Sequence, residues 1–326
     1  MANLSALRLR GVCKSFGTVR AVDNLDLDVP GGTTCGFIGP SGAGKTTCIR
    51  MIMSILFPDV GELSVLGLPS ALDAKDRIGY LPEERGVYRR MRVGQFLRYI
   101  GQLKGVGEAE AGRRADRLLD ELGLPDVTTK RCEDLSKGML HRVQFVAAVI
   151  NQPDLLILDE PFSGLDPVSV RRMKDVLARE QQRGATILFS THVMAQAEEL
   201  CEHVVMIHNG RKVLDEPMSG LRRQFDPGTI RLQPLELDAD PASLSRMAAV
   251  ASVRPFAEGV EIRLRDGVNP AEAMQQIASH VTPARIEFAR ITLEDVFVRL
   301  VSGGHDEQER AIRANLQDID VEEPVR

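Results

Sequence analysis

One short segment constrains this chain more than any other: GPSGAGKTT at residues 39–47. It follows the apolar run TTCGFIG (33–39), which has the pattern of a buried strand, and it opens a segment that we expect to be helical. Its glycines permit a loop whose backbone N–H groups point inward at phosphate oxygens, and a helix N-terminus adds partial positive charge. A Gly-rich turn with these residues by coincidence is the alternative, but the preceding strand argues against it. The segment therefore predicts a phosphate-binding loop in an α/β fold.

Two side chains of this loop carry the chemistry of nucleotide binding. Lys45 supplies a positive charge to the terminal phosphates, and Thr46 offers its hydroxyl to Mg²⁺. We expect the whole loop to contact ATP, through Gly39, Pro40, Ser41, Gly42, Ala43, Gly44, Lys45, Thr46 and Thr47.

A second apolar run, LLILDE (155–160), ends in two acids. Because parallel sheets hold ligands beyond the carboxyl ends of their strands, we expect these acids beside the phosphate loop. Asp159 would then orient a water on Mg²⁺, and Glu160 would act as the general base on the attacking water. The alternative is that both acids merely leave the sheet for solvent, which the upstream phosphate loop disfavours.

His192 directly follows a third apolar run, ATILFST (185–191). It is expected at the same edge of the sheet, where it would hold the γ-phosphate and the attacking water in line beside Glu160. A lone histidine at a strand end is more often structural, so the pattern alone leaves both interpretations open.

The first part of the chain has the pattern of one α/β domain. Residues 1–225 read as strands alternating with helices, and the pattern turns mainly helical at about 91–150. LRLRGVCKSF (7–16) and VDNLDLDV (22–29) alternate as antiparallel strands do.

The remainder predicts a second, smaller unit and a tail. Residues 229–301 read β-α-β-β-α-β plus a final helix that Thr292 would cap, the order of a small α+β ferredoxin-like domain. Its first helix is expected at 241–250, and a hairpin is expected to turn at Glu258-Gly259. Residues 302–326 hold seven acids and three arginines, which favours a loose acidic tail.

Composition disfavours several classes of protein. Lys and Arg total 41 against 46 Asp and Glu, so the chain has no basic excess for nucleic acid. No run approaches the roughly 18 to 20 apolar residues that span a bilayer, and no signal peptide is visible, so any membrane role needs a partner. The five cysteines are scattered without a metal-ligand spacing, which disfavours a disulfide framework or a zinc site.

Taken in order, the segments GPSGAGKTT, LSKGM, LLILDEP, SGLD and STH resemble those of the nucleotide-binding subunits of ABC transporters, over roughly residues 4–215. The resemblance implies a P-loop NTPase core with an antiparallel β subdomain and a helical subdomain. It also implies that two copies sandwich two ATP molecules, each between the phosphate loop of one copy and LSKGM (135–139) of the other.

Further roles follow from the resemblance. The signature acting on the partner's ATP would be Ser136, Lys137, Gly138 and Met139. Asp166 would link the two copies across their interface. Phe16 would stack on adenine, although plain core packing is an equally open interpretation.

The sequence departs from the family pattern at three positions. Lys137 and Met139 replace the glycine and glutamine of the usual LSGGQ, and Glu83 replaces a glutamine. A carboxylate can bind Mg²⁺ but repels the γ-phosphate, so we hypothesise that Glu83 senses the metal more than the phosphate. LPEERGVY (81–88), LSKGM and a terminal LEDVF (293–297) resemble the type-2 exporter subgroup, which includes sodium-extruding and multidrug systems.

The leading hypothesis is an ATPase that powers an exporter from the cytoplasmic face of the membrane. ATP and Mg²⁺ are the expected cofactors, and membrane-spanning permease subunits and a second copy of this chain, a homodimer, are the expected partners. A soluble ABC ATPase that is not coupled to transport is the alternative, and a nucleotide sensor without hydrolysis is a third. The single ATPase core and the acidic balance disfavour the soluble alternative, while Lys45, Asp159, Glu160 and His192 together disfavour the sensor.

Overall fold

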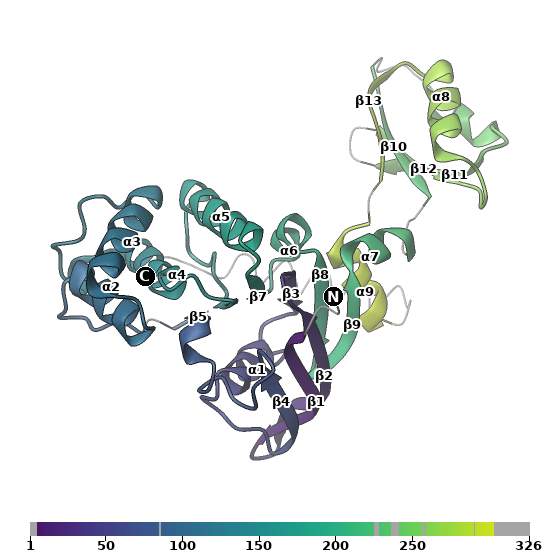
Figure 1. Ribbon diagram of the computed structural model, residues 1–326. Helices are drawn as coiled ribbons and strands as arrows, with labels where there is room; N and C mark the ends of the chain where they lie inside the picture. Colours follow the sequence, from purple (N-terminus) through teal and green to yellow (C-terminus); the bar gives the residue numbers. More distant parts are fainter. Residues whose placement is uncertain are drawn as a thin grey trace. The chain divides into compact units, whose positions relative to one another are not determined.

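The computed structural model describes residues 5–84, 86–224, 228–235, 241–256, 259–289 and 291–302. Its contacts group the chain into two compact units, one formed by residues up to Met218 together with those from Leu300 onward, and the other by Ser219–Arg299 (Figure 1). The predicted boundary at residue 225 lies just after helix α7 (Met218–Gln224), which the contacts place almost wholly with the second unit. The proposed acidic tail lies outside the described residues except for Ser302.

A six-stranded sheet forms the centre of the first unit. Its strands are β3 (Thr34–Ile38), β5 (Ile78–Leu81), β6 (Leu155–Asp159), β7 (Thr186–Thr191), β8 (His203–His208) and β9 (Arg211–Pro217). The order is β5-β6-β7-β3-β8-β9, and only the β8–β9 pair is antiparallel. Every residue of β3, β6 and β7 is buried, as their mainly apolar sequences predict for parallel strands covered on both faces.

A three-stranded antiparallel sheet packs on one side of this centre. Its strands are β1 (Ser5–Phe16), β2 (Val19–Pro30) and β4 (Val60–Val65), in the order β2-β1-β4. Side chains of β1 and β2 share one apolar core with Ile49 of helix α1 (Lys45–Ile52) and Phe37 of β3. Burial against both sheets therefore fixes the helix that begins at the phosphate loop.

Three helices form the helical part of the first unit: α2 (Val93–Leu103), α3 (Glu108–Glu121) and α4 (Lys137–Val149) (Figure 1). Two further helices follow the ends of central strands, α5 (Pro167–Gln182) after β6 and α6 (Met194–Leu200) after β7. Ser136 caps α4 by accepting a hydrogen bond from the Met139 N–H, and Asp166 caps α5 by accepting one from the Ser169 N–H. No helix among the described residues is long and apolar enough to cross a membrane.

The second unit contains a four-stranded antiparallel sheet with the order β11-β12-β10-β13. Its strands are β10 (Thr229–Pro234), β11 (Val250–Phe256), β12 (Gly259–Leu264) and β13 (Pro283–Phe288), and the helices α8 (Pro270–His280) and α9 (Leu293–Ser302) follow β12 and β13. The strand order is that of the predicted ferredoxin-like fold. The Asp295 N–H donates to the Thr292 hydroxyl at the start of α9, as predicted for a cap.

One element of the second unit differs from the prediction. The segment expected to be a helix at 241–250 is a short 3₁₀ turn, Pro241–Arg246. Val250 already pairs with Leu264 in the sheet, and Leu244 alone within the turn joins the core cluster, so too little chain remains for an amphipathic α-helix. The expected turn residue Glu258 lies outside the described residues.

Candidate functional site

The phosphate loop lines a hollow of about 700 Å³ at the carboxyl edge of the central sheet. The loop needs glycine where its backbone turns: Gly44 has φ of 106°, and a Cβ there would lie 2.4 Å from the Ala21 carbonyl oxygen. Most of the remaining lining comes from residues that follow β6 and β7, including Glu160, Ser163, Gly164 and His192, and Ala21 and Glu83 complete it. The fold thus brings together segments that lie more than a hundred residues apart.

Lys45 lies at the floor of this hollow with 7% of its surface exposed. Its Nζ donates to the carbonyl oxygens of Gly39 at 2.7 Å and Pro40 at 3.3 Å, and it lies 3.6 Å from Glu160 Oε1. Burial lowers the pKa of Lys45, while the carboxylates of Glu160 and Asp159 oppose that shift. A buried ammonium beside an open hollow is suited to an anionic ligand such as the terminal phosphates of ATP.

Three oxygen-bearing side chains meet beside Lys45 in an arrangement that fits a hard divalent cation. The Thr46 hydroxyl lies 3.4 Å from both Asp159 Oδ1 and Glu83 Oε2. Asp159 Oδ2 is buried and has no hydrogen-bond partner among the described residues. Such an orphaned carboxylate oxygen, next to a hydroxyl and a second carboxylate, is the donor set that Mg²⁺ prefers.

The pKa values of the two carboxyl groups in this set support the same interpretation. Burial raises the pKa of Asp159, against hydrogen bonds from Ser190 and Thr46 that lower it. Burial, followed by the charges of Asp159 and Glu160, raises the pKa of Glu83. A bound cation would offset the repulsion between these carboxylates.

Glu160 and His192 face each other at the ends of adjacent strands. His192 Nδ1 lies 3.0 Å from Glu160 Oε1, and because a carboxylate only accepts, the imidazole N–H donates. Glu160 adopts φ of 48°, in the left-handed region that non-glycine residues rarely occupy. The sequence-predicted base and histidine are therefore brought together, in an unusual backbone conformation that the sequence did not reveal.

Ser190 is a residue of this site that the sequence reasoning missed. It is fully buried on β7, donates to Asp159 Oδ1 at 2.5 Å and accepts from the Glu160 N–H at 3.1 Å. The available signal was a hydroxyl near the end of a mainly apolar strand, two residues before His192.

Other predicted site residues do not line the hollow of a single copy. The exposed N-terminus of α4, with Ser136 and Lys137, lies outside it, as does Asp166, although the neighbouring Ser163 and Gly164 are within it. Phe16 ends β1 with 48% of its surface exposed, and Lys14 Nζ lies 5.7 Å from its ring centroid. The exposure rules out plain core packing for Phe16 and leaves its ring available to a ligand.

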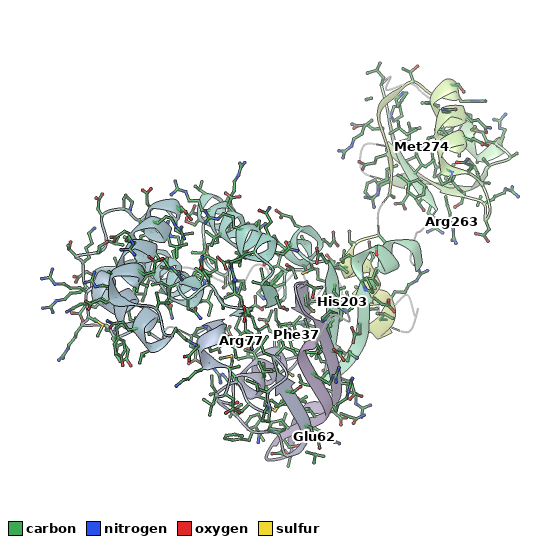
Figure 2. All side chains as sticks on the ribbon, viewed as in Figure 1. Phe37, Glu62, Arg77, His203, Arg263 and Met274 are labelled. Atoms are coloured by element: carbon green, nitrogen blue, oxygen red, sulfur yellow. The ribbon has the colours of Figure 1, made fainter. Side chains whose placement is uncertain are left out.

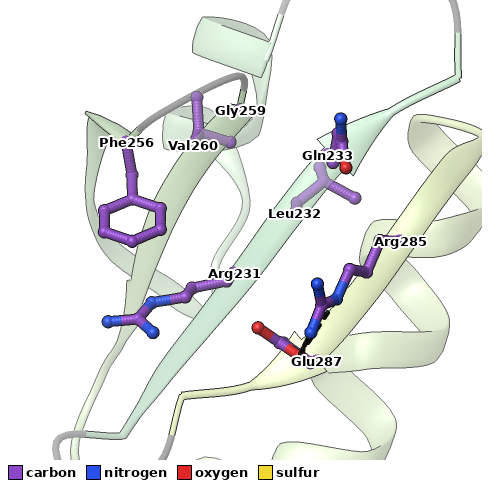
Figure 3. A pocket seen from close by; sticks show the side chains of 8 residues that line it. All are labelled: Arg231, Leu232, Gln233, Phe256, Gly259, Val260, Arg285 and Glu287. Atoms are coloured by element: carbon purple, nitrogen blue, oxygen red, sulfur yellow. Dashed lines mark hydrogen bonds and ion pairs between the residues drawn. The ribbon is translucent and has the colours of Figure 1, made fainter.

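A separate hollow of about 300 Å³ lies in the second unit, on the sheet face of β10 (Figure 3). The guanidinium of Arg231 lies 4.3 Å from the Phe256 ring centroid and 3.3 Å from Glu261, and Arg285 pairs with Glu287 at 2.7 Å. Its arginines are thus paired with carboxylates, and this arrangement suggests no catalytic chemistry.

Figure 2 shows the two units with their side chains, and comparisons with known proteins match each unit separately. Residues 22–163 match a family model described as ABC transporter. Residues 217–301 match a model described as ATP-binding protein DrrA1-3-like, C-terminal domain. The first match contains the phosphate loop, the signature segment and Glu160.

Two relatives and a solved structure agree with these matches. The uncharacterized ABC transporter ATP-binding protein YhaQ of Bacillus subtilis is 35% identical over 92% of this chain and 100% of its own. Nod factor export ATP-binding protein I of Cupriavidus metallidurans is 39% identical over 64% of this chain and 70% of its own. A structure described as the ATP-binding subunit of an ABC transporter aligns with a TM-score of 0.63 and 32% identity, over 68% of this chain and 93% of that one.

Proposed function

Because this chain belongs to the ATP-binding proteins of ABC transporters, we propose that its ATPase activity drives export through separate membrane-spanning subunits. One observation carries this proposal: Lys45, Glu160 and His192 line one open hollow from three different segments, and Asp159 Oδ1 lies 3.4 Å from the hydroxyl of Thr46, which also lines it. Export is supported by the relative whose name includes Nod factor export.

Within the hollow, the side chains divide the work of phosphoryl transfer to water. The loop from Gly39 to Thr47 holds the phosphates through backbone N–H groups, and Lys45 neutralises charge on the terminal ones. Glu160 accepts a proton from the attacking water, and His192, 3.0 Å away, orients that carboxylate and the γ-phosphate. Phe16, exposed at the end of β1, stacks on the adenine.

We assign the cation of this reaction to Thr46, Asp159 and Glu83, whose oxygens lie together next to Lys45. Mg²⁺, when bound, supplies charge that offsets the negative phosphates. Regular elements position two of the three side chains of this cation site: Thr46 lies on α1 and Asp159 on β6, whereas Glu83 follows the end of β5.

A second copy of the chain completes the site. Ser136, Lys137, Gly138 and Met139 begin helix α4 but do not line the hollow of their own copy. In the proposed homodimer, the N-terminus of the partner's α4 meets the open side of the γ-phosphate, and Asp166 stands at the interface between the copies. ATP then favours the closed dimer and hydrolysis releases it.

The surface that transmits this motion is an aromatic cluster at α2. Tyr88 is 55% exposed and Tyr99 is 38% exposed, and their rings meet edge to face with centroids 5.7 Å apart. Phe96 supports Tyr88 from below, with ring centroids 6.3 Å apart and only 3% exposure. Two exposed aromatic rings on a rigid base fit an apolar segment of a membrane subunit.

The test is affinity isolation of the full chain carrying Glu160→Gln from native membranes, in the presence of ATP and Mg²⁺. We expect a polytopic membrane protein to be co-isolated, dependent on both additions. A Tyr88→Ala/Tyr99→Ala double variant should lose that partner and keep ATP binding. Phe57→Ala, which removes another exposed aromatic ring, is the matched control.

The opposite results are equally informative. Recovery of only soluble partners by Glu160→Gln would replace the transporter proposal with a soluble ABC ATPase. Retention of the membrane protein by the tyrosine double variant would overturn the docking surface alone.

A further inference from the structure

Ser190 contacts both Asp159 and Glu160 but has no role in the proposed reaction as described so far. It lies on β7 directly opposite Asp159 of β6 in the parallel register and is fully buried. Its hydroxyl donates to Asp159 Oδ1 at 2.5 Å and accepts from the Glu160 backbone N–H at 3.1 Å. One hydroxyl therefore holds two consecutive residues, the one assigned to the cation and the one assigned to the water.

The first of these bonds sets the orientation of the Asp159 carboxylate. Ser190, at 2.5 Å, and Thr46, at 3.4 Å, both donate to Oδ1. Oδ2 has no partner among the described residues. With Oδ1 engaged by two hydroxyls, Oδ2 is the oxygen left to meet a cation.

The second bond supports the backbone of Glu160. A residue with a Cβ at φ of 48° has a strained backbone, so surrounding contacts must maintain it. The Ser190 hydroxyl accepts the N–H of Glu160 itself. In this conformation the Glu160 carboxylate reaches both His192, at 3.0 Å, and Lys45, at 3.6 Å.

We propose that Ser190 is a positioning residue that orients the Asp159 carboxylate and the Glu160 backbone together, so that cation recognition and water activation depend on one buried hydroxyl. This inference rests on the proposed hydrolysis of ATP with Mg²⁺ at this site. Ser190 acts through its two neighbours and touches neither substrate nor water.

If Ser190 only stabilised the fold, its removal would lower stability without changing Mg²⁺-dependent binding. Another residue of β7 provides a control for that possibility. Thr186 begins β7, is 2% exposed, and its hydroxyl accepts from the Gly32 N–H at 2.8 Å. It is therefore a second buried, hydrogen-bonded hydroxyl on β7, at the end away from the hollow. Removing either hydroxyl should lower stability, but only Ser190 connects to the site.

The experiment compares Ser190→Ala, Ser190→Thr and Thr186→Val in the full-length chain. Binding of a fluorescent ATP analogue is titrated with Mg²⁺ and again with EDTA, alongside kcat and KM for ATP hydrolysis. Ser190→Ala should bind within about twofold of wild type in EDTA and about tenfold more weakly with Mg²⁺, the size expected from one lost hydrogen bond to a charged group. Its kcat should fall about a hundredfold, as when one positioned donor is removed from an active site.

The controls separate positioning from folding. Ser190→Thr keeps the hydroxyl and should restore both the Mg²⁺ effect on binding and most of kcat. Thr186→Val should lower the melting temperature as Ser190→Ala does, without changing either quantity. Equal weakening of Ser190→Ala binding with and without Mg²⁺, or an equal loss in Thr186→Val, would overturn the inference. A wild-type chain that does not hydrolyse ATP in the presence of Mg²⁺ would instead overturn the proposed function on which the inference rests.

Discussion

The imidazole of His192 and the carboxylate of Glu160 form a 3.0 Å contact across the ends of two neighbouring strands, so removing either group should impair the same step of hydrolysis. Glu160→Gln removes the base but keeps a side chain of the same shape, and His192→Ala removes only its orienting partner. We expect ATP binding to survive both changes. The kcat value should fall by about 10² to 10⁴ in each, as is usual for general bases and their partners.

His280→Ala provides the matched control for this comparison, since that histidine is exposed on α8 in the second unit. It should leave kcat and KM unchanged. A His192→Ala variant with wild-type kcat would remove His192 from the site and leave a structural role.

Glu83 tests the metal hypothesis through two opposite effects. Burial and the charges of Asp159 and Glu160 raise its pKa, so this carboxylate is repelled by its neighbours unless a cation lies between them. Glu83→Gln removes a charged ligand and that repulsion together. We expect weaker Mg²⁺ binding, so that activity is half-saturated at an Mg²⁺ concentration about threefold or more higher, and tighter ATP binding in EDTA.

Glu84→Gln is a suitable control for this prediction, because the adjacent carboxylate is exposed and pairs with Arg50 at 3.0 Å. An unchanged Mg²⁺ dependence in Glu83→Gln would count against metal sensing. A loss of ATP binding without Mg²⁺ would indicate contact with the phosphates instead.

The phosphate loop and the acids after β6 could be predicted from sequence because each lies within one contiguous strand-to-loop segment. A buried apolar run identifies the strand. Because the strands are parallel, the carboxyl end of each lies at the edge of the sheet where ligands bind. Ser190 could not be found in this way, since its partner Asp159 lies on another strand and the register that joins them is a tertiary property. The left-handed backbone of Glu160 is equally invisible in its residue type.

The second unit also shows what local sequence patterns can and cannot predict. Alternating strands around the Ile230 and Ile262 core gave the correct strand order, because one face of each strand must be buried. The segment at 241–250 had helical composition, but the pairing of Val250 with Leu264 decided its conformation. In this segment the pairing of strands outweighs the helix propensity of the local sequence.

Glu121 should make the stability of the first unit depend on pH. Arg179 of α5 donates to both carboxylate oxygens of Glu121 on α3, one of them at 2.9 Å. These bonds lower the pKa of Glu121 below its ordinary value of 4.5. A carboxyl whose pKa is lower in the folded state stabilises the fold above its unfolded pKa, and that contribution is lost as the pH falls through the folded value.

At pH 7, Glu121→Gln should therefore unfold at a lower temperature than the wild type. Because Arg179 is 51% exposed, the loss should stay below about 1 kcal/mol. The difference should shrink as the pH is lowered beneath about 4.5, which differential scanning fluorimetry across a pH series can follow. Asp126→Asn, at an exposed carboxylate, is the control. A difference that persists unchanged at low pH would assign the loss to packing.

The exposed start of α4 predicts that two inactive variants restore each other. Lys45→Ala disables the phosphate loop, and Ser136→Glu places a negative charge where the partner's γ-phosphate is proposed to bind. Each should be inactive alone. In a mixed dimer, however, one site combines the intact loop of the Ser136→Glu copy with the intact signature of the Lys45→Ala copy.

Random mixing makes half of the dimers mixed, with one working site of two, so activity should recover to about one quarter of wild type for independent sites of a symmetric dimer. The measurement is ATP hydrolysis after the two variants are co-expressed or mixed at equal concentration. Lys45→Ala combined with Glu160→Gln should show no recovery, because both changes lie in the same half of the site. Activity that stays at the sum of the separate variants would mean that each copy hydrolyses ATP without the partner's signature.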